Sequence, residues 1–456
     1  MSSAIALNRF GLGARPDESP PANPKSWLLD QFGRYDTRPA PWGDIPTASE
    51  IAAKLADERQ ATAPGPDNAM ARAQLRQENQ TIYRQAVAAR MQSALVTSTP
   101  FVERLVHFWT NHFAVSADKV VVVPYAGAFE AEAIRPHVLG RFQDLLIAAE
   151  RHAAMMLYLD QARSIGPNSA FATRAAERSP ARKLGLNENL AREILELHTL
   201  GVRTGYTQSD VTEFARALTG WSIQDVGRPG GQQAGPPGEY LFRPAMHEPG
   251  ARTVLGRTYR QPGEGQALAI LHDLAAAKAT ADHIAFKLAR HFVADDPPPS
   301  LVNKLSAAFT RSAGDLPTVY RALVEAPEGW DAPPRKFKTP WEWAVSAMRG
   351  VGVRDAGVIQ AAPMMQQLGQ PIWRPGSPAG YDDVAASWAA PDALVRRVEF
   401  AQRIGARAGD RLDPRTLSTQ LLPGPVSEGT TQAIARADSG ATGLALLLVS
   451  PDFQRR

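Results

Sequence analysis

Residues 186–202 read LNENLAREILELHTLGV, a stretch whose pattern is repeated along most of the chain. On a helical wheel its apolar residues fall on one arc, as in a helix with one buried face. His198 lies near the middle of that arc, where an apolar side chain would be expected. The stretch therefore predicts a helix that ends at Gly201 and carries a buried histidine.

The same spacing of apolar residues by three and four recurs elsewhere and predicts an all-α fold, a multi-helix globular bundle. Helices are expected at 68–96, 100–113, 142–158, 187–200, 208–218, 280–293, 316–326 and 340–349. Thr99 before Pro100 predicts a capped helix start, Thr207 predicts a capping box, and Gly220 predicts a helix end. Strands are expected only at 120–123 and 253–255, which could pair in a small hairpin.

The length of 456 residues, with 44% hydrophobic and 21% charged side chains, is typical of a globular protein with a large core. We expect a single large helical domain over residues 1–456. The segment 225–240 is rich in glycine and proline and predicts a surface insertion, and a second loop is expected near Thr62.

Composition excludes several classes of function. Fifty basic and 46 acidic side chains give a net charge of +4, and without a basic run the sequence gives no indication of nucleic-acid binding. The absence of cysteine excludes disulfides, thiol nucleophiles and zinc–thiolate sites. No GxSxG, P-loop or HExxH motif occurs, and the glycines at Gly11 and Gly13 follow no predicted strand, so they do not indicate a dinucleotide site.

The apolar stretches are far shorter than the roughly 20 residues of a membrane-spanning helix. The N-terminal residues do not show the charged start and apolar core of a secretory signal. The expectation is a cytoplasmic chain without a membrane span, which would reach the periplasm only in complex with an exported partner.

A second histidine, His112, falls within the apolar arc of the helix expected at 100–113. The polar residues of that helix take its opposite side; they are Glu103, Arg104, His107 and Asn111. A buried imidazole without a hydrogen-bond partner costs roughly 1–3 kcal/mol, so each buried ring needs a partner.

Three interpretations of the two histidines remain open. Each could be a core histidine bonded to a backbone carbonyl or an amide. Alternatively, His112 and His198 could converge with Glu193, and with His247 of the HEPG stretch, on a first-row divalent metal. In the third interpretation Glu193 and a histidine form a cofactor-free acid–base site with shifted pKa values.

The remaining polar residues of the 187–200 helix have two interpretations. Glu188, Arg192 and Glu196 are spaced by four, as in surface ion pairs. Asn187 can cap the helix start, and if that start is buried its amides would favour an anion. In that case Asn189 and Arg192 would belong to the catalytic site.

A second polar group combines RKFKTPWEW at 335–343 with KLARHF at 287–292. Thr339 and Pro340 indicate a helix start, and Lys336 and Lys338 precede its positive end, so an anion site is conceivable. Solvated lysines beside a cap are the favoured interpretation. The three tryptophans of this part of the chain are expected in the core; they are Trp341, Trp343 and Trp373.

A family resemblance is carried by successive blocks. These include LNRFGLGARP, RLVHFWTNHFAVS, LYLDQARSIGPNS, GLNENLAREILELHTLGV, GYTQSDVTEFARALTGWSI, FRPAMHEPG, KLARHFVADDPPP, KFKTPWEWAVSAMRG and LGQPIWRPGSPAGYDD. In this order they resemble the bacterial family called domain of unknown function 1800. The resemblance implies one continuous unit, and it alone suggests that Asp160 and Asn168 lie near the histidine site. It implies no activity.

Genes of that family often lie beside genes of domain of unknown function 1501, whose members resemble exported sulfatases or phosphatases. The resemblance therefore implies such a protein as a partner. The favoured function is an enzyme with a buried histidine–glutamate site, in one form a metal-dependent hydrolase or oxidoreductase. The alternatives are a non-catalytic partner or maturation factor for the exported protein, and an inert ligand-binding protein.

Overall fold

The computed structural model describes residues 2–61, 68–178, 185–224, 235–331, 334–422 and 424–456. These residues are mostly helical, and their extended segments form two small antiparallel sheets of two strands each. The prediction of an all-α fold is confirmed. Within the same residues no helix is both long and apolar enough to span a membrane, which agrees with the sequence-based expectation.

The α-helices follow in chain order: α1 (Ser2–Ile5), α2 (Pro24–Leu29), α3 (Ala48–Ala61), α4 (Asn68–Val96), α5 (Pro100–His112), α6 (Ala126–Phe129), α7 (Phe142–Arg151), α8 (Ala153–Tyr158), α9 (Ala170–Arg178), α10 (Asn189–Glu193), α11 (Gln208–Leu218), α12 (Glu264–Ala276), α13 (Lys278–Phe292), α14 (Pro299–Arg311), α15 (Leu316–Glu325), α16 (Pro340–Gly350), α17 (Ala361–Gln367), α18 (Ala385–Trp388), α19 (Pro391–Ala408), α20 (Pro414–Leu421), α21 (Glu428–Ala435) and α22 (Gly440–Val449). Helical turns of the wider π type occur at Ala6–Phe10, Glu130–Ile134 and Ile194–His198. The strands are β1 (Trp221–Ile223), β2 (Tyr240–Phe242), β3 (Arg252–Val254) and β4 (Arg257–Tyr259).

The predicted strand at 120–123 is wrong, because this segment forms turns that lead into a 3₁₀ turn at Val123–Tyr125. The strand expected at 253–255 corresponds to β3, which pairs with β4 rather than with that segment. The pair β1–β2 was not expected, and it flanks the glycine- and proline-rich insertion. Residues 225–234 of the insertion, and the loop at 62–67, lie outside the described residues.

Two predicted helix starts behave differently. Thr207 forms the predicted capping box with Asp210 and begins α11, which ends before Gly220 with its φ of 88°. Thr99 stands at the N-cap position of α5, but its hydroxyl makes no capping hydrogen bond. The amide of Phe101 instead donates to Oε1 of Gln31 at 2.8 Å, so a distant side chain satisfies this helix end.

The helix predicted over 142–158 is broken at His152 into α7 and α8. His152 has extended backbone angles, and its Nδ1 accepts a hydrogen bond from the amide of Ala154 at 3.1 Å. A histidine thus acts as the N-cap of α8. Histidine is not among the usual capping residues, so the apolar periodicity on both sides concealed this break.

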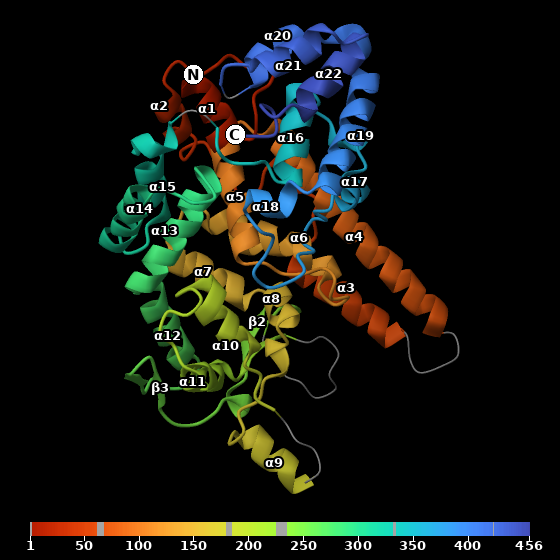
Figure 1. Cartoon of the computed structure of the whole chain (residues 1–456). Coiled ribbons are helices and arrows are strands. Elements are labelled where there is room, and N and C mark those ends of the chain that lie inside the picture. The colour runs from red at the N-terminus through yellow and green to blue at the C-terminus, as the bar shows by residue number, and fades with distance from the viewer. Residues whose placement is uncertain (1, 62–67, 179–184, 225–234, 332–333, 423) are drawn as a thin grey trace.

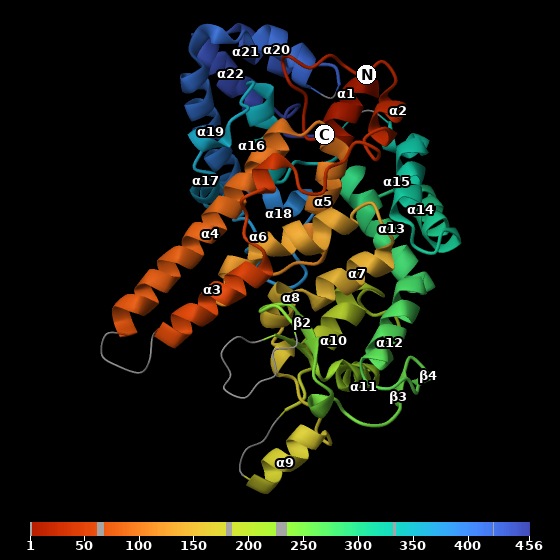
Figure 2. The same cartoon turned by 180° about the vertical axis from the view of Figure 1, so that it is seen from behind.

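The helices surround α5, which runs through the middle of the molecule (Figure 1). Helices α16 and α19–α22 lie at one end, α13–α15 lie along one side, and α7–α12 form the other end, as the view from behind also shows (Figure 2). Buried apolar side chains form two clusters. The first is built largely from α5, α7, α8 and α10–α15, and the second from α4, α16, α17 and α19–α22.

Helix α5 lies at the seam between the two clusters and is buried on nearly every side. The polar side that the helical wheel placed opposite the apolar arc is therefore also covered, with Glu103, Arg104 and His107 all less than 10% exposed. A buried charge must be paired and hydrogen-bonded, so this side of α5 determines what packs against it.

Glu342 connects α5 to α16 across the seam. One of its carboxylate oxygens forms ion pairs with Arg104 and, at 2.6 Å, with Arg456. The other accepts the amide of Thr339 at 3.0 Å and completes a capping box at the start of α16. Burial would raise the pKa of Glu342, but Arg456 and Arg104 outweigh it and hold that pKa below its usual range.

The two ends of the described chain meet this seam. The backbone amide of Arg456 donates to the carbonyl of Lys336 at 2.9 Å, and its guanidinium donates to the carbonyl of His291 at 2.8 Å. At the other end, Arg104 donates to the carbonyl of Gly11 at 2.6 Å. Gly13 has a φ of 104° and packs so tightly that a Cβ atom would lie 2.7 Å from that of Ser346. These glycines therefore serve backbone packing.

The substitution Glu342→Gln tests the role of this carboxylate. Glutamine keeps an oxygen for the capping box but leaves two buried guanidinium groups without a counter-charge, so we expect the free energy of unfolding to fall by about 3–5 kcal/mol. Chemical denaturation measures this change. Glu325→Gln, on the exposed side of α15, is the matched control and should change stability little. Equal stability of the two variants would contradict the assignment.

Candidate functional site

His112 and His198 are both only 1% exposed, which confirms the predicted burial. Their ring centroids lie 6.2 Å apart, but the rings do not hydrogen-bond to each other. Nε2 of His112 instead donates to the backbone carbonyl of His198 at 3.1 Å. The interpretation of His112 as a core histidine bonded to a carbonyl therefore describes its observed contact.

The end of the π turn Ile194–His198 explains this contact. The last carbonyls of a helix have no partner within it. His112 from α5 satisfies the carbonyl of His198, and His283 from α13 satisfies the carbonyl of Leu197 at 3.1 Å. Gly201, with a φ of 95°, lies against the ring of His283 and lets the chain turn away. Two imidazoles thus supply the hydrogen-bond donors for the last carbonyls of one helix end.

His198 has a different carboxylate partner from the predicted one. Its Nδ1 donates to Oε1 of Glu150 at 2.7 Å, and this glutamate is fully buried. Glu193 is half-buried and its pKa is raised, first by burial, but no hydrogen bond joins it to His112 or His198 among the described residues. The rings of His112 and His198 thus lie close together, but the carboxylate that is hydrogen-bonded to His198 is Glu150 rather than Glu193.

The other predicted site residues lie apart from this pair. Asn189 is exposed, and its amide donates to Oδ1 of Asn187, which caps the helix start. Arg192 forms the surface ion pair with Glu188 at 3.3 Å. His247 donates from Nδ1 to the carbonyl of Thr219 at 2.9 Å.

Two residues that only the resemblance placed near the histidines are also engaged elsewhere. Asp160 pairs with Lys119 at 2.7 Å, and Asn168 donates to Glu248 at 2.6 Å. In the part of the chain that the structure describes, no group of three or more histidine, aspartate or glutamate side chains could hold a metal ion.

A cavity of about 400 Å³ lies between α5 and α13. The start of α16 and the segment 370–383 form its other walls. Residues from both segments of the second polar group, 287–292 and 335–343, line the cavity. His112 lines the cavity, whereas His198 lies behind it. A volume of this size fits a small organic molecule.

His291 and Asp383 form a hydrogen-bonded pair in the cavity wall. Nδ1 of His291 donates to Oδ2 of Asp383 at 2.7 Å, and Nε2 of the same ring has no partner among the described residues. Burial lowers the pKa of His291, and Asp383 offsets this only in part. The ring is therefore neutral near pH 7, with its proton on Nδ1 and a lone pair on Nε2.

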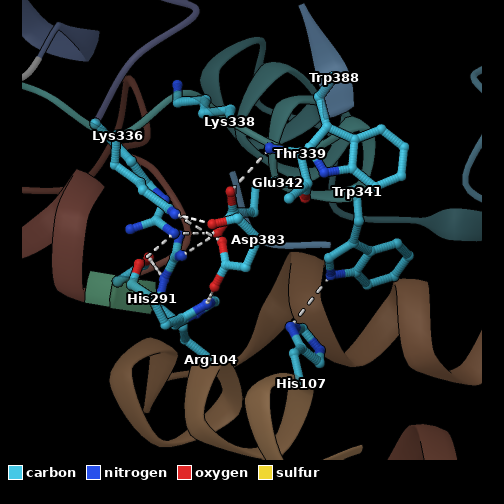
Figure 3. Close-up of polar contacts among 12 residues, drawn as sticks. Arg104, His107, His291, Lys336, Lys338, Thr339, Trp341, Glu342, Asp383 and Trp388 are labelled. Atoms are coloured by element: carbon cyan, nitrogen blue, oxygen red, sulfur yellow. Dashed lines mark hydrogen bonds and ion pairs between the residues drawn. The ribbon is translucent and has the colours of Figure 1, made fainter. Parts of the chain in front are cut away.

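Lys336 fixes Asp383 from the side away from the cavity. Its Nζ lies 3.0 Å from Asp383, a contact drawn in Figure 3, and 2.7 Å from Asp295. Burial would raise the pKa of Asp383, but His291 and then Lys336 outweigh it and keep the carboxylate ionised. The expectation that Lys336 and Lys338 are solvated is wrong, because they are 0% and 2% exposed. The chain end around Arg456 covers them.

The opposite wall comes from α5 and the tryptophans. Trp341 donates to Nδ1 of His107 at 3.1 Å, a contact visible in Figure 3, and the guanidinium of Arg90 lies over Trp341 and Trp373. Trp341, Trp343 and Trp373 are buried as expected, although the first and third also line the cavity. Trp373 has a φ of 49°, a strained backbone of the kind found at functional sites.

The sequence interpretation included Lys287 and His291 in a polar group, but it did not recognise the polar side of α13 to which His283 also belongs. His283, Lys287 and His291 are spaced by four and line the cavity together, while the apolar residues of α13 face the core. This spacing was visible in the sequence as a polar stripe on an otherwise apolar helix. Asp383 offered no such signal, because it lies in an irregular segment about 90 residues further along the chain.

The buried histidines predict a stability that depends on pH. Burial, followed by nearby cations, lowers the pKa of His107 and of His283 to about 4. Between pH 6.5 and 4 the unfolded chain binds more protons than the folded chain. The free energy of unfolding should therefore fall by roughly 1.4 kcal/mol per pH unit for each histidine as the pH drops through this window.

Urea denaturation at several pH values between 7 and 4.5 measures this slope. His107→Gln retains an acceptor for Trp341 and should reduce the slope, whereas His272→Gln, at an exposed position, should not. A slope of zero or of opposite sign in the wild type would contradict the buried neutral histidines.

Comparison with known proteins identifies the family. The family described as "Protein of unknown function (DUF1800)" matches residues 5–455. No curated protein and no solved structure matches the chain. Because the match covers nearly the whole sequence, as the order of the sequence blocks suggested, the chain belongs to the family of domain of unknown function 1800.

Proposed function

We propose that this protein is an enzyme that transfers protons to and from a small anionic molecule bound between α5 and α13. One observation carries the proposal: His291, in the cavity wall, is oriented by Asp383 and has an unpartnered Nε2. A neutral imidazole with its tautomer fixed by a carboxylate is the arrangement that general-base catalysis requires. In this proposal His291 is the base and Asp383 is a positioning residue.

The charges of the cavity favour an anionic substrate. Its lining carries four cationic side chains and three carboxylates; these are Arg90, Arg104, Lys287, Arg290, Glu342, Asp382 and Asp383. Two of the carboxylates already pair with cations behind the wall, Glu342 with Arg456 and Asp383 with Lys336. Arg90 is neutralised by Glu130 and Arg104 by Glu342, but neither Lys287 nor Arg290 forms an ion pair with a described carboxylate, so these two cations are uncompensated.

This proposal differs from the sequence-based expectation in its residues. The buried histidine–glutamate pair formed by His198 and Glu150 lies in the core, outside the cavity lining. The acid–base chemistry is therefore assigned to His291, and the chemistry proposed for it needs only side chains of this chain. Because the described residues offer no group of metal ligands, no step is assigned to a metal.

Turnover tests the proposed base. A panel of small carboxylates and phosphates is first screened for thermal stabilisation of the protein, and each ligand found is followed by NMR for conversion. We expect His291→Gln to lower the turnover rate by about 10²- to 10⁴-fold while the affinity changes little. The acid limb of the wild-type rate should lie below pH 6.5, because the pKa of His291 is lowered.

Asp295 and Asp383 give a matched pair of variants, because both contact Lys336 but only Asp383 contacts His291. Asp383→Asn should reduce turnover and change the pH profile, whereas Asp295→Asn should affect mainly stability. Exposed His272→Gln should match the wild type. Ligands that bind in the cavity without any conversion would identify an inert binding protein and refute the enzyme proposal.

A second candidate function is that of a partner for an exported protein of domain of unknown function 1501. The observation that favours it is the shape of the α3–α4 region, which extends away from the body in both views (Figures 1 and 2). An ion pair between Lys54 and Glu78 at 3.0 Å joins the two helices, and Met70 is 77% exposed. A projecting helix pair of this kind offers a surface for another protein.

Co-purification tests the partner function. The full chain and a Met70→Glu variant are each expressed with the neighbouring protein of domain of unknown function 1501. Retention of that protein by the wild type and its loss with Met70→Glu would support the role of the projecting helices, because a charge replaces an exposed apolar side chain. Absence of any complex in both cases would refute it.

A further inference from the structure

Lys287 lies on the cavity side of α13, four residues before His291. Its side chain is half-buried, and no ion pair or hydrogen bond to it occurs among the residues that the structure describes. Residues four apart on a helix are neighbours on its surface, so the amine of Lys287 and the ring of His291 share one side of the cavity. The proposed base thus has an unpaired amine beside it.

The other lysines near the cavity show that this situation is unusual. Lys336 is completely buried and contacts two carboxylates, Asp295 and Asp383. Lys338 is buried without a hydrogen-bond partner, but it lies against the ring of Phe453, away from the cavity lining, and carries no marked contact in Figure 3. Lys287 combines access to the cavity with the absence of a counter-charge.

The surroundings of Lys287 favour its neutral amine. The nearest titratable groups include the neutral imidazoles of His112 and His283 and the guanidinium of Arg290, while Asp383 is already paired. Burial, with Arg290, lowers the pKa of Lys287 to about 8, although Asp383 opposes the shift. At pH 7 this gives roughly two hundredfold more free amine than an ordinary lysine has.

We propose that Lys287 is a nucleophilic amine that forms an imine with the carbonyl carbon of a small carboxylated aldehyde or ketone. The neutral amine nitrogen bonds to the carbonyl carbon and gives up its two protons, which leave with the carbonyl oxygen as water, and a C=N bond replaces C=O. No oxidant or reductant is consumed. The positive charge of Arg290, which has no ion-pair partner among the described residues, suits the carboxylate of such a molecule, and the aromatic walls suit its carbon atoms.

This inference rests on the proposed function of the cavity and adds the class of substrate. It also gives His291 a task, because imine formation requires proton transfers at the nitrogen and at the departing oxygen. A protonated imine would in turn make the adjacent carbon more acidic, which is the kind of proton that His291 could remove.

Reductive trapping with glyoxylate and sodium cyanoborohydride tests the imine, since the reductant converts it into a stable secondary amine. Peptide mapping by mass spectrometry then locates the label in the intact wild-type protein. At pH 7 we expect Lys287 to be modified at least about tenfold faster than the exposed lysines, with a rate that rises to half its maximum near pH 8. Labelling spread over surface lysines, or concentrated at Lys338, would overturn the proposal.

Three variants test whether the labelling depends on the amine of Lys287, on lysines of α13 in general or on His291. Lys287→Arg keeps a cation and should lose the labelling, whereas Lys278→Arg, exposed on the same helix, should keep it. Unchanged labelling at other positions and an unchanged circular dichroism spectrum show that Lys287→Arg is folded. His291→Gln should still be labelled at Lys287, but more slowly than the wild type, because His291 moves protons during imine formation.

The two proposals can therefore fail separately. Turnover that depends on His291, without preferential labelling of Lys287, would overturn the imine alone. Labelling of Lys287 in a protein that converts no ligand would overturn the enzyme proposal and leave a reactive amine. Reversible protection by glyoxylate without any covalent product would show that Lys287 binds anions only, and would also overturn the imine.

Discussion

The buried carboxylate of Glu342 is the constraint on which the rest of the structure depends. It lies between two apolar clusters, where an unpaired charge would be very costly. Arg104 and Arg456 neutralise it, so α5, α16 and the end of the described chain must meet at one place. The position of Arg456 then covers Lys336, whose charge fixes Asp383 beside the cavity. The arrangement of the site thus follows from the ion pairs formed at this seam.

The buried histidines have two separate physical reasons. His112 and His283 donate hydrogen bonds to the carbonyls that have no partner at the end of the π turn. This structural role also places both rings in the cavity wall. His291 completes no helix end, and its carboxylate partner comes from a segment far along the chain. His112, His198 and His291 each have one ring nitrogen without a hydrogen-bond partner among the described residues, but His291 combines it with a carboxylate partner and a position in the cavity wall. This difference separates the candidate base from the histidines that the apolar arcs revealed.

Charge pairing also distinguishes the lysines around the cavity. The fold supplies the fully buried Lys336 with two carboxylates and the half-buried Lys287 with none. Stability alone would favour a partner for Lys287 or an apolar replacement. An uncompensated amine next to an oriented imidazole therefore connects the packing of α13 with the proposed reaction. The same lack of pairing is the reason for proposing an anionic substrate.

The sequence alone determined the local structure, because helix periodicity and caps depend on neighbouring residues. It correctly predicted the all-α class, the bounds of α4 and α11, and the burial of His112 and His198. The interpretation of the chain as one domain over residues 1–456 stays a prediction. A helical wheel shows which side of α5 is apolar, but not that a second cluster covers the polar side. Only the tertiary structure decided that Lys336 is buried and that His291 meets Asp383, since these contacts join segments about 45 and 90 residues apart and depend on the pairing of charges across the seam.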